Sequence, residues 1–118
     1  MASVNLDISQ ELDITCRKGD TFKLTMNITD SSNQAVDVTQ YSFRMEVKAS
    51  ASAEPITTFT NSDFSKSSDG TLVIRKSATD MQFAAGAYLY DIEATLNSDN
   101  TVQTWITGTL ILNEDITD

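Results

Sequence analysis

Apolar and polar residues alternate with a period of two along much of the chain, and this alternation constrains the fold more than any other feature. In residues 22–28, 41–47 and 88–96, every second side chain is apolar and those between are mainly polar. Side chains alternate between the two faces of a β-strand, so each segment is predicted to be a strand with one buried face. A helix would place its apolar residues three or four positions apart.

Four further segments bring the number of predicted strands to about seven. They are residues 12–16, 56–59, 72–74 and 102–112. Ser77 and Asp80 predict one short helical turn before the penultimate strand, because Ser77 is a good cap and Asp80 lies near the positive end of the helix dipole. Short strands separated by polar turns at this spacing favour an all-β sandwich.

The chain has 118 residues, which suits a single domain. We expect residues 12–118 to form the sandwich and residues 1–11 to be an N-terminal arm with little reason to be ordered alone. Such an arm can lie across a neighbouring protein, so Val4 and Leu6 are candidate interface residues. The first residues lack the pattern of a secretory signal, and we expect the protein to be made and assembled in a cytoplasm.

The residue types that most often perform catalysis are scarce. The chain contains no histidine and a single cysteine, Cys16. Serine–histidine and cysteine–histidine nucleophile pairs, zinc sites of cysteine and histidine, and an internal disulfide are therefore excluded. The four glycines form no phosphate-binding loop. We expect no catalytic residues, no cofactor and no bound metal, and hence a protein that is not an enzyme.

Carboxylates are the remaining candidates for chemistry. Asp91 and Glu93 are predicted to lie on the outward face of a strand, and this pattern does not place a carboxylate pair in a concave site. Calcium favours loop carboxylates, but no run has the spacing of an EF-hand loop. Turn formation accounts for the aspartates of loops and strand ends. These residues are Asp30, Asp37, Asp69, Asp99 and Asp115.

The net charge restricts the partners. The chain has eight basic and 17 acidic residues, which gives a formal net charge of −9 at pH 7. This charge disfavours binding to nucleic acid and to anionic membrane surfaces. It favours solubility, and it also suits a partner with a basic face. No segment approaches the ~20 consecutive apolar residues of a membrane-spanning helix.

The last predicted strand is apolar on both faces. Trp105 and Ile111 lie on one face, and four aliphatic residues lie on the other. A strand of this kind is buried on both sides or covered by a partner, so Trp105 and Ile111 are candidate interface residues. Trp105 and Tyr41 are also candidates for stacking on a sugar ring, whereas a core position for Trp105 would count against carbohydrate binding.

Residues 86–90 resemble the tyrosine corner of immunoglobulin-like domains. The segment has the form Gly-x-Tyr-x-Tyr, with Tyr90 at the position where such domains often carry a cysteine. The resemblance implies structural roles for Gly86, Tyr88 and Tyr90. It further implies that the Tyr88 hydroxyl bonds back to the preceding helical turn.

The order of four segments resembles a larger family. A Gly-Asp-Thr turn at residues 19–21 is followed by the segment 36–43, the tyrosine segment 86–92 and a closing stretch at 108–117. This order is similar to the immunoglobulin-like domain at the N-terminus of phage baseplate upper proteins and of tail-fibre-like virion proteins. Gln40 stands where that domain usually has glycine. The resemblance covers nearly the whole chain.

The resemblance implies an immunoglobulin-like β-sandwich and a non-catalytic structural role. The expected protein is a docking module of a phage tail, baseplate or fibre apparatus, located in the virion. Its partners would be other virion proteins in a symmetric oligomeric assembly. A capsid decoration protein of the phage head is one alternative. A carbohydrate-binding adhesion module is another, less favoured alternative, which exposed aromatic side chains in a row would support.

Overall fold

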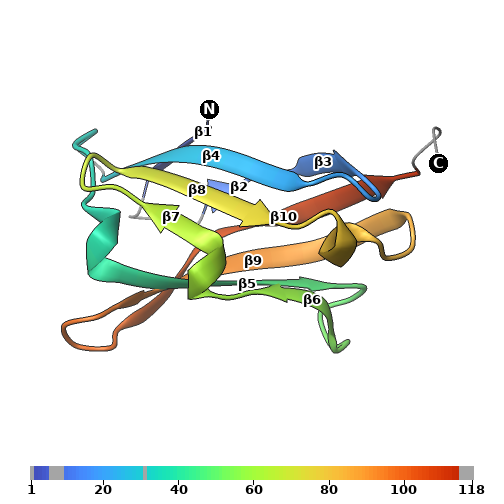
Figure 1. Cartoon of the computed structure of the whole chain (residues 1–118). Coiled ribbons are helices and arrows are strands. Elements are labelled where there is room, and N and C mark those ends of the chain that lie inside the picture. Colours follow the sequence, from blue (N-terminus) through green and yellow to red (C-terminus); the bar gives the residue numbers. More distant parts are fainter. Residues whose placement is uncertain (1, 6–9, 31, 115–118) are drawn as a thin grey trace.

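Two sheets packed face to face make up the protein, as Figure 1 shows. The structure is a computed structural model and describes residues 2–5, 10–30 and 32–114. The four-stranded sheet has the following order: β1 (Ala2–Asn5), β4 (Phe22–Thr29), β8 (Thr71–Lys76) and β7 (Phe64–Lys66). In the six-stranded sheet, two short strands lie along β10 and three longer strands follow it. These are β2 (Gln10–Glu11), β3 (Ile14–Arg17), β10 (Val102–Asn113), β9 (Gly86–Leu96), β5 (Tyr41–Lys48) and β6 (Pro55–Phe59).

The strand order identifies an immunoglobulin-like sandwich. The order β1-β4-β8-β7 corresponds to strands A, B, E and D of that fold, and β10-β9-β5-β6 corresponds to G, F, C and C′. The connection from β4 to β5 crosses between the sheets, and so does the connection from β6 to β7. The predicted all-β immunoglobulin-like fold is therefore confirmed.

The structure contains three strands and two helical turns beyond those that we predicted. β7 has three residues, of which only Phe64 is apolar, so it shows no alternation. The expected turn before the penultimate strand is the 3-10 helix η3 (Thr79–Met81), in which the Asp80 backbone N–H donates to the Ser77 hydroxyl oxygen over 3.3 Å. The other two turns are η1 (Val38–Gln40) and η2 (Asn61–Asp63).

Within the expected arm of residues 1–11, the described residues 2–5 and 10–11 belong to the sheets. Ala2–Asn5 form β1, which pairs in parallel with β4, and Gln10–Glu11 form β2, which pairs in parallel with β10. Val4 pairs with Ile28 in this register, and Leu6 lies outside the described residues. Open edges of β4 and β10 accept these short strands, since backbone pairing needs no alternating pattern.

Aromatic rings fill the space between the sheets. The Trp105 ring lies 4.8 Å from that of Tyr41 and 5.3 Å from that of Phe43, measured between centroids. Phe43 stacks on Phe64 of the facing sheet at 5.3 Å. Among the described residues, no polar or charged residue is fully buried. Contacts of this kind connect the two layers in a domain whose only cysteine, Cys16, is free and half-buried.

Two lysines tie the sheets together along the side where β6, η2 and β7 link the layers in Figure 1. The Lys66 ammonium, on β7, donates to the Tyr41 carbonyl oxygen over 2.8 Å. The Lys76 ammonium, on β8, donates to the Thr58 carbonyl oxygen of β6 over 3.0 Å and forms an ion pair with Asp63 at 3.1 Å. Both ammonium groups therefore satisfy oxygen atoms at this side of the sandwich.

Candidate docking surface on the six-stranded sheet

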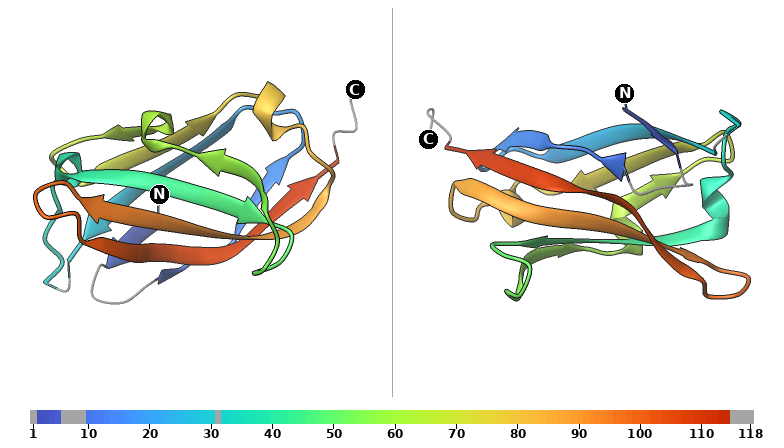
Figure 2. Two further views of the ribbon diagram at one scale, coloured as in Figure 1. Left: turned by 90° about the horizontal axis from the view of Figure 1, so that it is seen from below. Right: turned by 180° about the vertical axis from the view of Figure 1, so that it is seen from behind.

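The outer face of the six-stranded sheet carries exposed apolar side chains. Figure 2 (left) looks onto this sheet, with β10, β9, β5 and β6 in order. Along β9 the residues Tyr88 and Tyr90 are buried, so Leu89 between them points outward and is 45% exposed. By the same alternation, Ile111 on β10 points outward and is 38% exposed.

Leu89, Ile111 and the exposed residue Ala87 form what we call the apolar patch. Ile111 pairs directly with Ala87, and Leu89 pairs with Thr109, two residues from Ile111. Cross-strand partners and their diagonal neighbours are close enough for side-chain contact. Val102, 55% exposed, lies on the same strand as Ile111 but next to the polar turn at its far end.

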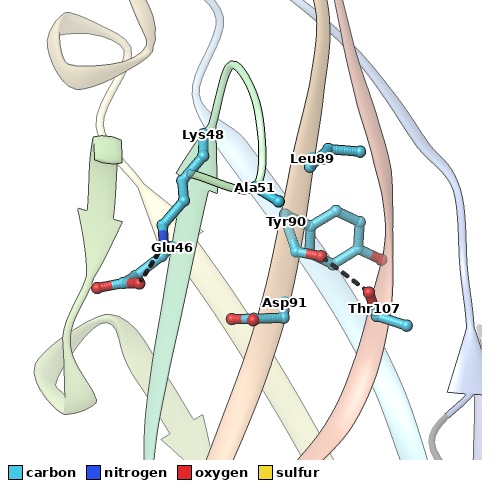
Figure 3. Close-up of a pocket in the computed structure, with 7 residues that line it drawn as sticks. All are labelled: Glu46, Lys48, Ala51, Leu89, Tyr90, Asp91 and Thr107. Atoms are coloured by element: carbon cyan, nitrogen blue, oxygen red, sulfur yellow. Dashed lines mark hydrogen bonds and ion pairs between the residues drawn. The ribbon is translucent and has the colours of Figure 1, made fainter. Parts of the chain in front are cut away.

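A shallow pocket adjoins the apolar patch at Leu89. Its volume is about 190 Å³, and Figure 3 shows its lining residues. They come from β5, β9, β10 and the loop after β5 (Glu46, Lys48, Ala51, Leu89, Tyr90, Asp91 and Thr107). Pockets for small-molecule ligands usually measure roughly 300–1,000 Å³. This pocket is therefore the size of a side chain rather than of a whole ligand.

Glu46, on the β5 side of the pocket, is held between two cations. Arg44 Nη2 lies 2.8 Å from Glu46 Oε2, and Lys48 Nζ lies 3.7 Å from Glu46 Oε1. The hydrogen bond from Arg44 is the main reason why the pKa of Glu46 is lowered; the charges of Arg44 and Lys48 act in the same direction. The negative charge of Glu46 is thus already compensated.

Asp91 stands directly opposite Glu46 in the β5–β9 register. In Figure 3 its carboxylate points towards β5. The pKa of Asp91 is raised, first by burial and second by the charge of Glu46, while Lys48 acts against this. Among the described residues, no hydrogen-bond donor reaches the Asp91 carboxylate. Asp91 is consequently a half-buried acid whose carboxylate can accept hydrogen bonds from a bound group.

The structure therefore brings together a carboxylate pair that the sequence pattern did not place. The predicted outward position of Asp91 is correct, but the alternating pattern did not place it in a concave site. The loop after β5 raises a wall at Ala51 and makes the face concave there. Glu93, the other outward acid on β9, pairs with Arg44 in the register and does not line the pocket.

Tyr90, behind the pocket, fastens the edge of the sheet. Its hydroxyl donates to the Leu12 carbonyl, at the junction between β2 and β3. The Leu12 N–H donates to Thr107, and the Asp13 carboxylate accepts from the Thr109 N–H over 3.1 Å. Gly108 is required here, because a Cβ atom on it would lie 2.1 Å from the Leu12 carbonyl oxygen. Burial, followed by the charge of Asp13, raises the pKa of Tyr90.

Tyr88 and Gly86 occupy the start of β9. The Tyr88 hydroxyl donates to the carbonyl of Ala84, four residues upstream. This is the type of bond a tyrosine corner makes, although its acceptor follows the helical turn rather than belonging to it. Gly86 has φ +156°, a value that L side chains rarely adopt. Its lack of a side chain lets β9 begin in this conformation.

Trp105 requires a correction. We expected it at an interface, but its exposed fraction is 1% and it packs in the core. The pairing of β9 and β10 is irregular between Thr104 and Ile106, so both Trp105 and Ile106 face inward. This β-bulge explains why the strand looked apolar on both faces. A sugar-stacking platform built on Trp105 loses its basis, whereas Ile111 does lie on the surface.

The loop aspartates form turns. Asp30, Asp37, Asp69 and Asp99 each accept a hydrogen bond from a backbone N–H two to four residues further along. Asp115 lies outside the described residues. Within residues 2–5, 10–30 and 32–114, no three His, Cys, Asp or Glu residues gather in a way that could hold a metal ion. No helix in those segments is long and apolar enough to cross a membrane.

No family model and no curated protein matches this chain. Among solved structures, the chain is similar to the natural killer (NK) cell receptor Nkp44, described as a triggering partner in natural cytotoxicity. The two share 16% sequence identity with a TM-score of 0.44, over 90% of this chain and 99% of that chain.

Proposed function

We propose that this protein is a non-catalytic docking module, and that the apolar patch with its adjoining pocket is the surface that binds the partner. The observation that carries the proposal is the clustering of Ala87, Leu89 and Ile111 beside a concave site on one sheet face. Exposed apolar side chains that gather in a patch with a polar border are typical of protein interaction sites.

The partners that we propose are other proteins of a bacteriophage virion. The support is the order of the turn, tyrosine and closing segments described above, which resembles the domain of phage baseplate upper and tail-fibre-like proteins. We therefore assign the protein to the tail, baseplate or fibre apparatus, in a symmetric assembly with several copies.

The carboxylate pair of Glu46 and Asp91 does not lead us to propose an enzyme. An enzyme would need one acid and one base that both reach a substrate. Glu46 is engaged by Arg44 and Lys48, so its oxygens are not free to act as a base. Asp91 alone, in a pocket of side-chain size, suits recognition better than group transfer.

Imaging tests the proposed location. Virions that carry a gold-labelled version of this protein should show label at the tail or baseplate by electron microscopy. Label on the head would replace this assignment with capsid decoration, and an absence of the protein from purified virions would contradict a virion role. Steady turnover of a polysaccharide by the purified protein would contradict the non-catalytic role.

A further inference from the structure

The pocket beside the apolar patch has a chemistry that selects one kind of side chain. Its volume of about 190 Å³ admits a side chain. Leu89 and Ala51 form an apolar wall of the pocket. The Asp91 carboxylate also lines the pocket and points towards β5. A side chain that fits this pocket needs an aliphatic stem that packs against the apolar wall and a positively charged hydrogen-bond donor that binds the Asp91 carboxylate.

We propose that this pocket binds an arginine side chain of the partner protein. The inference rests on the proposed docking function of the same face and names what that face recognises. A guanidinium group offers planar, paired donors that match both oxygens of a carboxylate, and its stem packs on apolar surface. Lysine offers only a compact point charge. The net charge of −9 attracts a basic segment to the whole protein.

The two acids of the pocket, Glu46 and Asp91, differ in how far their charges are already paired. Arg44 and Lys48 already hold Glu46, so Glu46 keeps Lys48 beside the acid pair and does not itself need a visitor. Asp91 lacks a hydrogen-bond donor among the described residues, and its pKa is raised by burial. An incoming guanidinium therefore gains most at Asp91. The Thr107 hydroxyl, on the β10 side, points to the Tyr90 carbonyl over 3.4 Å and leaves that side uncharged.

The test is an NMR titration of the full chain with N-acetyl-argininamide, and with N-acetyl-citrullinamide as the uncharged analogue, at constant ionic strength. We expect shifts of the amide signals at Leu89, Asp91 and Thr107 with the arginine compound, and at least ten-fold weaker binding of the citrulline compound. Equal binding of the two compounds would overturn the inference. So would shifts spread over surface acids such as Asp69.

Matched variants separate the pocket from general charge attraction. Asp91→Asn and Glu93→Gln each remove one negative charge from the outer side of β9. We expect Asp91→Asn to weaken the arginine compound ten-fold or more and Glu93→Gln to leave it within two-fold. Asp91→Asn should fold, because it relieves repulsion with Glu46. Leu89→Ser provides a second variant and should weaken binding without any change of charge.

These outcomes are distinguishable from failure of the docking proposal. If Leu89→Glu abolishes incorporation into particles while Asp91→Asn and the arginine compound have no effect, the docking surface stands and the arginine inference is wrong. If neither Leu89→Glu nor Ile111→Glu affects incorporation, the docking surface itself is wrong.

Discussion

Tyr90 is the residue on which the edge of the six-stranded sheet depends. Its hydroxyl satisfies the Leu12 carbonyl, 78 positions away in sequence, and Gly108 makes room for that carbonyl. The bond therefore holds β2 and β3 against β10, directly behind the pocket. A buried acceptor that loses its donor costs about 1–3 kcal/mol.

Tyr90→Phe should destabilise the protein by about 1–3 kcal/mol at pH 8, measured by urea unfolding. Tyr41→Phe is the control, since no hydrogen bond of its hydroxyl is found among the described residues, and it should have a much smaller effect. Equal losses in the two variants would contradict the role of the Leu12 bond.

The Tyr90→Phe difference should depend on pH. Folding raises the pKa of Tyr90 above the ordinary tyrosine value of about 10. The stability that the neutral hydroxyl contributes is therefore complete below about pH 10 and is lost as pH rises above it, because the unfolded chain ionises first. Between pH 8 and pH 11 the advantage of the wild type should shrink by at most about 1.4 kcal/mol. A constant difference would show that folding leaves the pKa of Tyr90 unchanged.

Trp105 and Ile111 separate core from surface on a single strand. Trp105→Ala should cost about 3–5 kcal/mol, because it removes a ring that contacts Tyr41 and Phe43. Ile111→Ala should change the free energy of unfolding by no more than about 0.5 kcal/mol. Urea unfolding of both variants measures the two values. A large loss of stability in Ile111→Ala would contradict a surface position for Ile111.

At the scale of elements, the alternating pattern was enough to predict the strands that bury one face. β4, β5 and β9 show it clearly, and burial of every second side chain is what holds them in place. β7 escaped prediction because three residues are too few to show a period, and its place depends on Phe64 stacking on Phe43. The bulge in β10 escaped because it breaks the period without any Gly or Pro to mark it.

The side of the sandwich near β6 depends on Lys76. Its side chain is 13% exposed and bonds to Thr58 and Asp63 from the facing sheet and the linking turn. Lys76→Met should lower the free energy of unfolding by about 1–3 kcal/mol, because the Thr58 carbonyl and the Asp63 carboxylate each lose the hydrogen bond from the ammonium group, and Asp63 keeps only its bond from the Thr60 N–H. Amide hydrogen exchange in β6 should accelerate.

The neighbouring Arg75 provides the control for Lys76. Arg75→Met removes the same charge from the same strand, but the side chain is exposed on the outer face. Its effect on unfolding should stay within about 0.5 kcal/mol. If the two variants exchange β6 amides at the same rate, Lys76 does not tie the sheets.

At the scale of the whole molecule, the fold was predictable and the candidate surface was predictable only in part. Ile111 was identified from the apolar character of the last strand. Trp105 was named as a candidate interface residue on the same ground, because the sequence does not reveal the bulge that turns it into the core. The pocket combines Glu46, Asp91 and Ala51 from separate segments. Their approach depends on strand pairing and on the course of one loop, neither of which a single sequence displays.

The two faces of the sandwich differ in their exposed side chains, and this difference supports the proposed docking surface. The outer face of the six-stranded sheet carries the apolar patch and the pocket, while the exposed positions of β4 and β8 include the basic pair Lys23 and Arg75. A partner that buries Leu89 and Ile111 would remove apolar surface from water at roughly 25 cal/mol per Å². An acidic substitution in that contact should therefore weaken binding strongly.

The proposed docking surface is tested by measuring how much of each variant is incorporated into virions. The copy number of the protein per purified virion is measured by quantitative mass spectrometry for Leu89→Glu, Ile111→Glu and the control Val102→Glu, which also places an acid at an exposed apolar position of β10. We expect the first two variants to fall ten-fold or more and Val102→Glu to stay within two-fold of the wild type. Wild-type copy numbers for all three variants would contradict docking through the outer face of the six-stranded sheet.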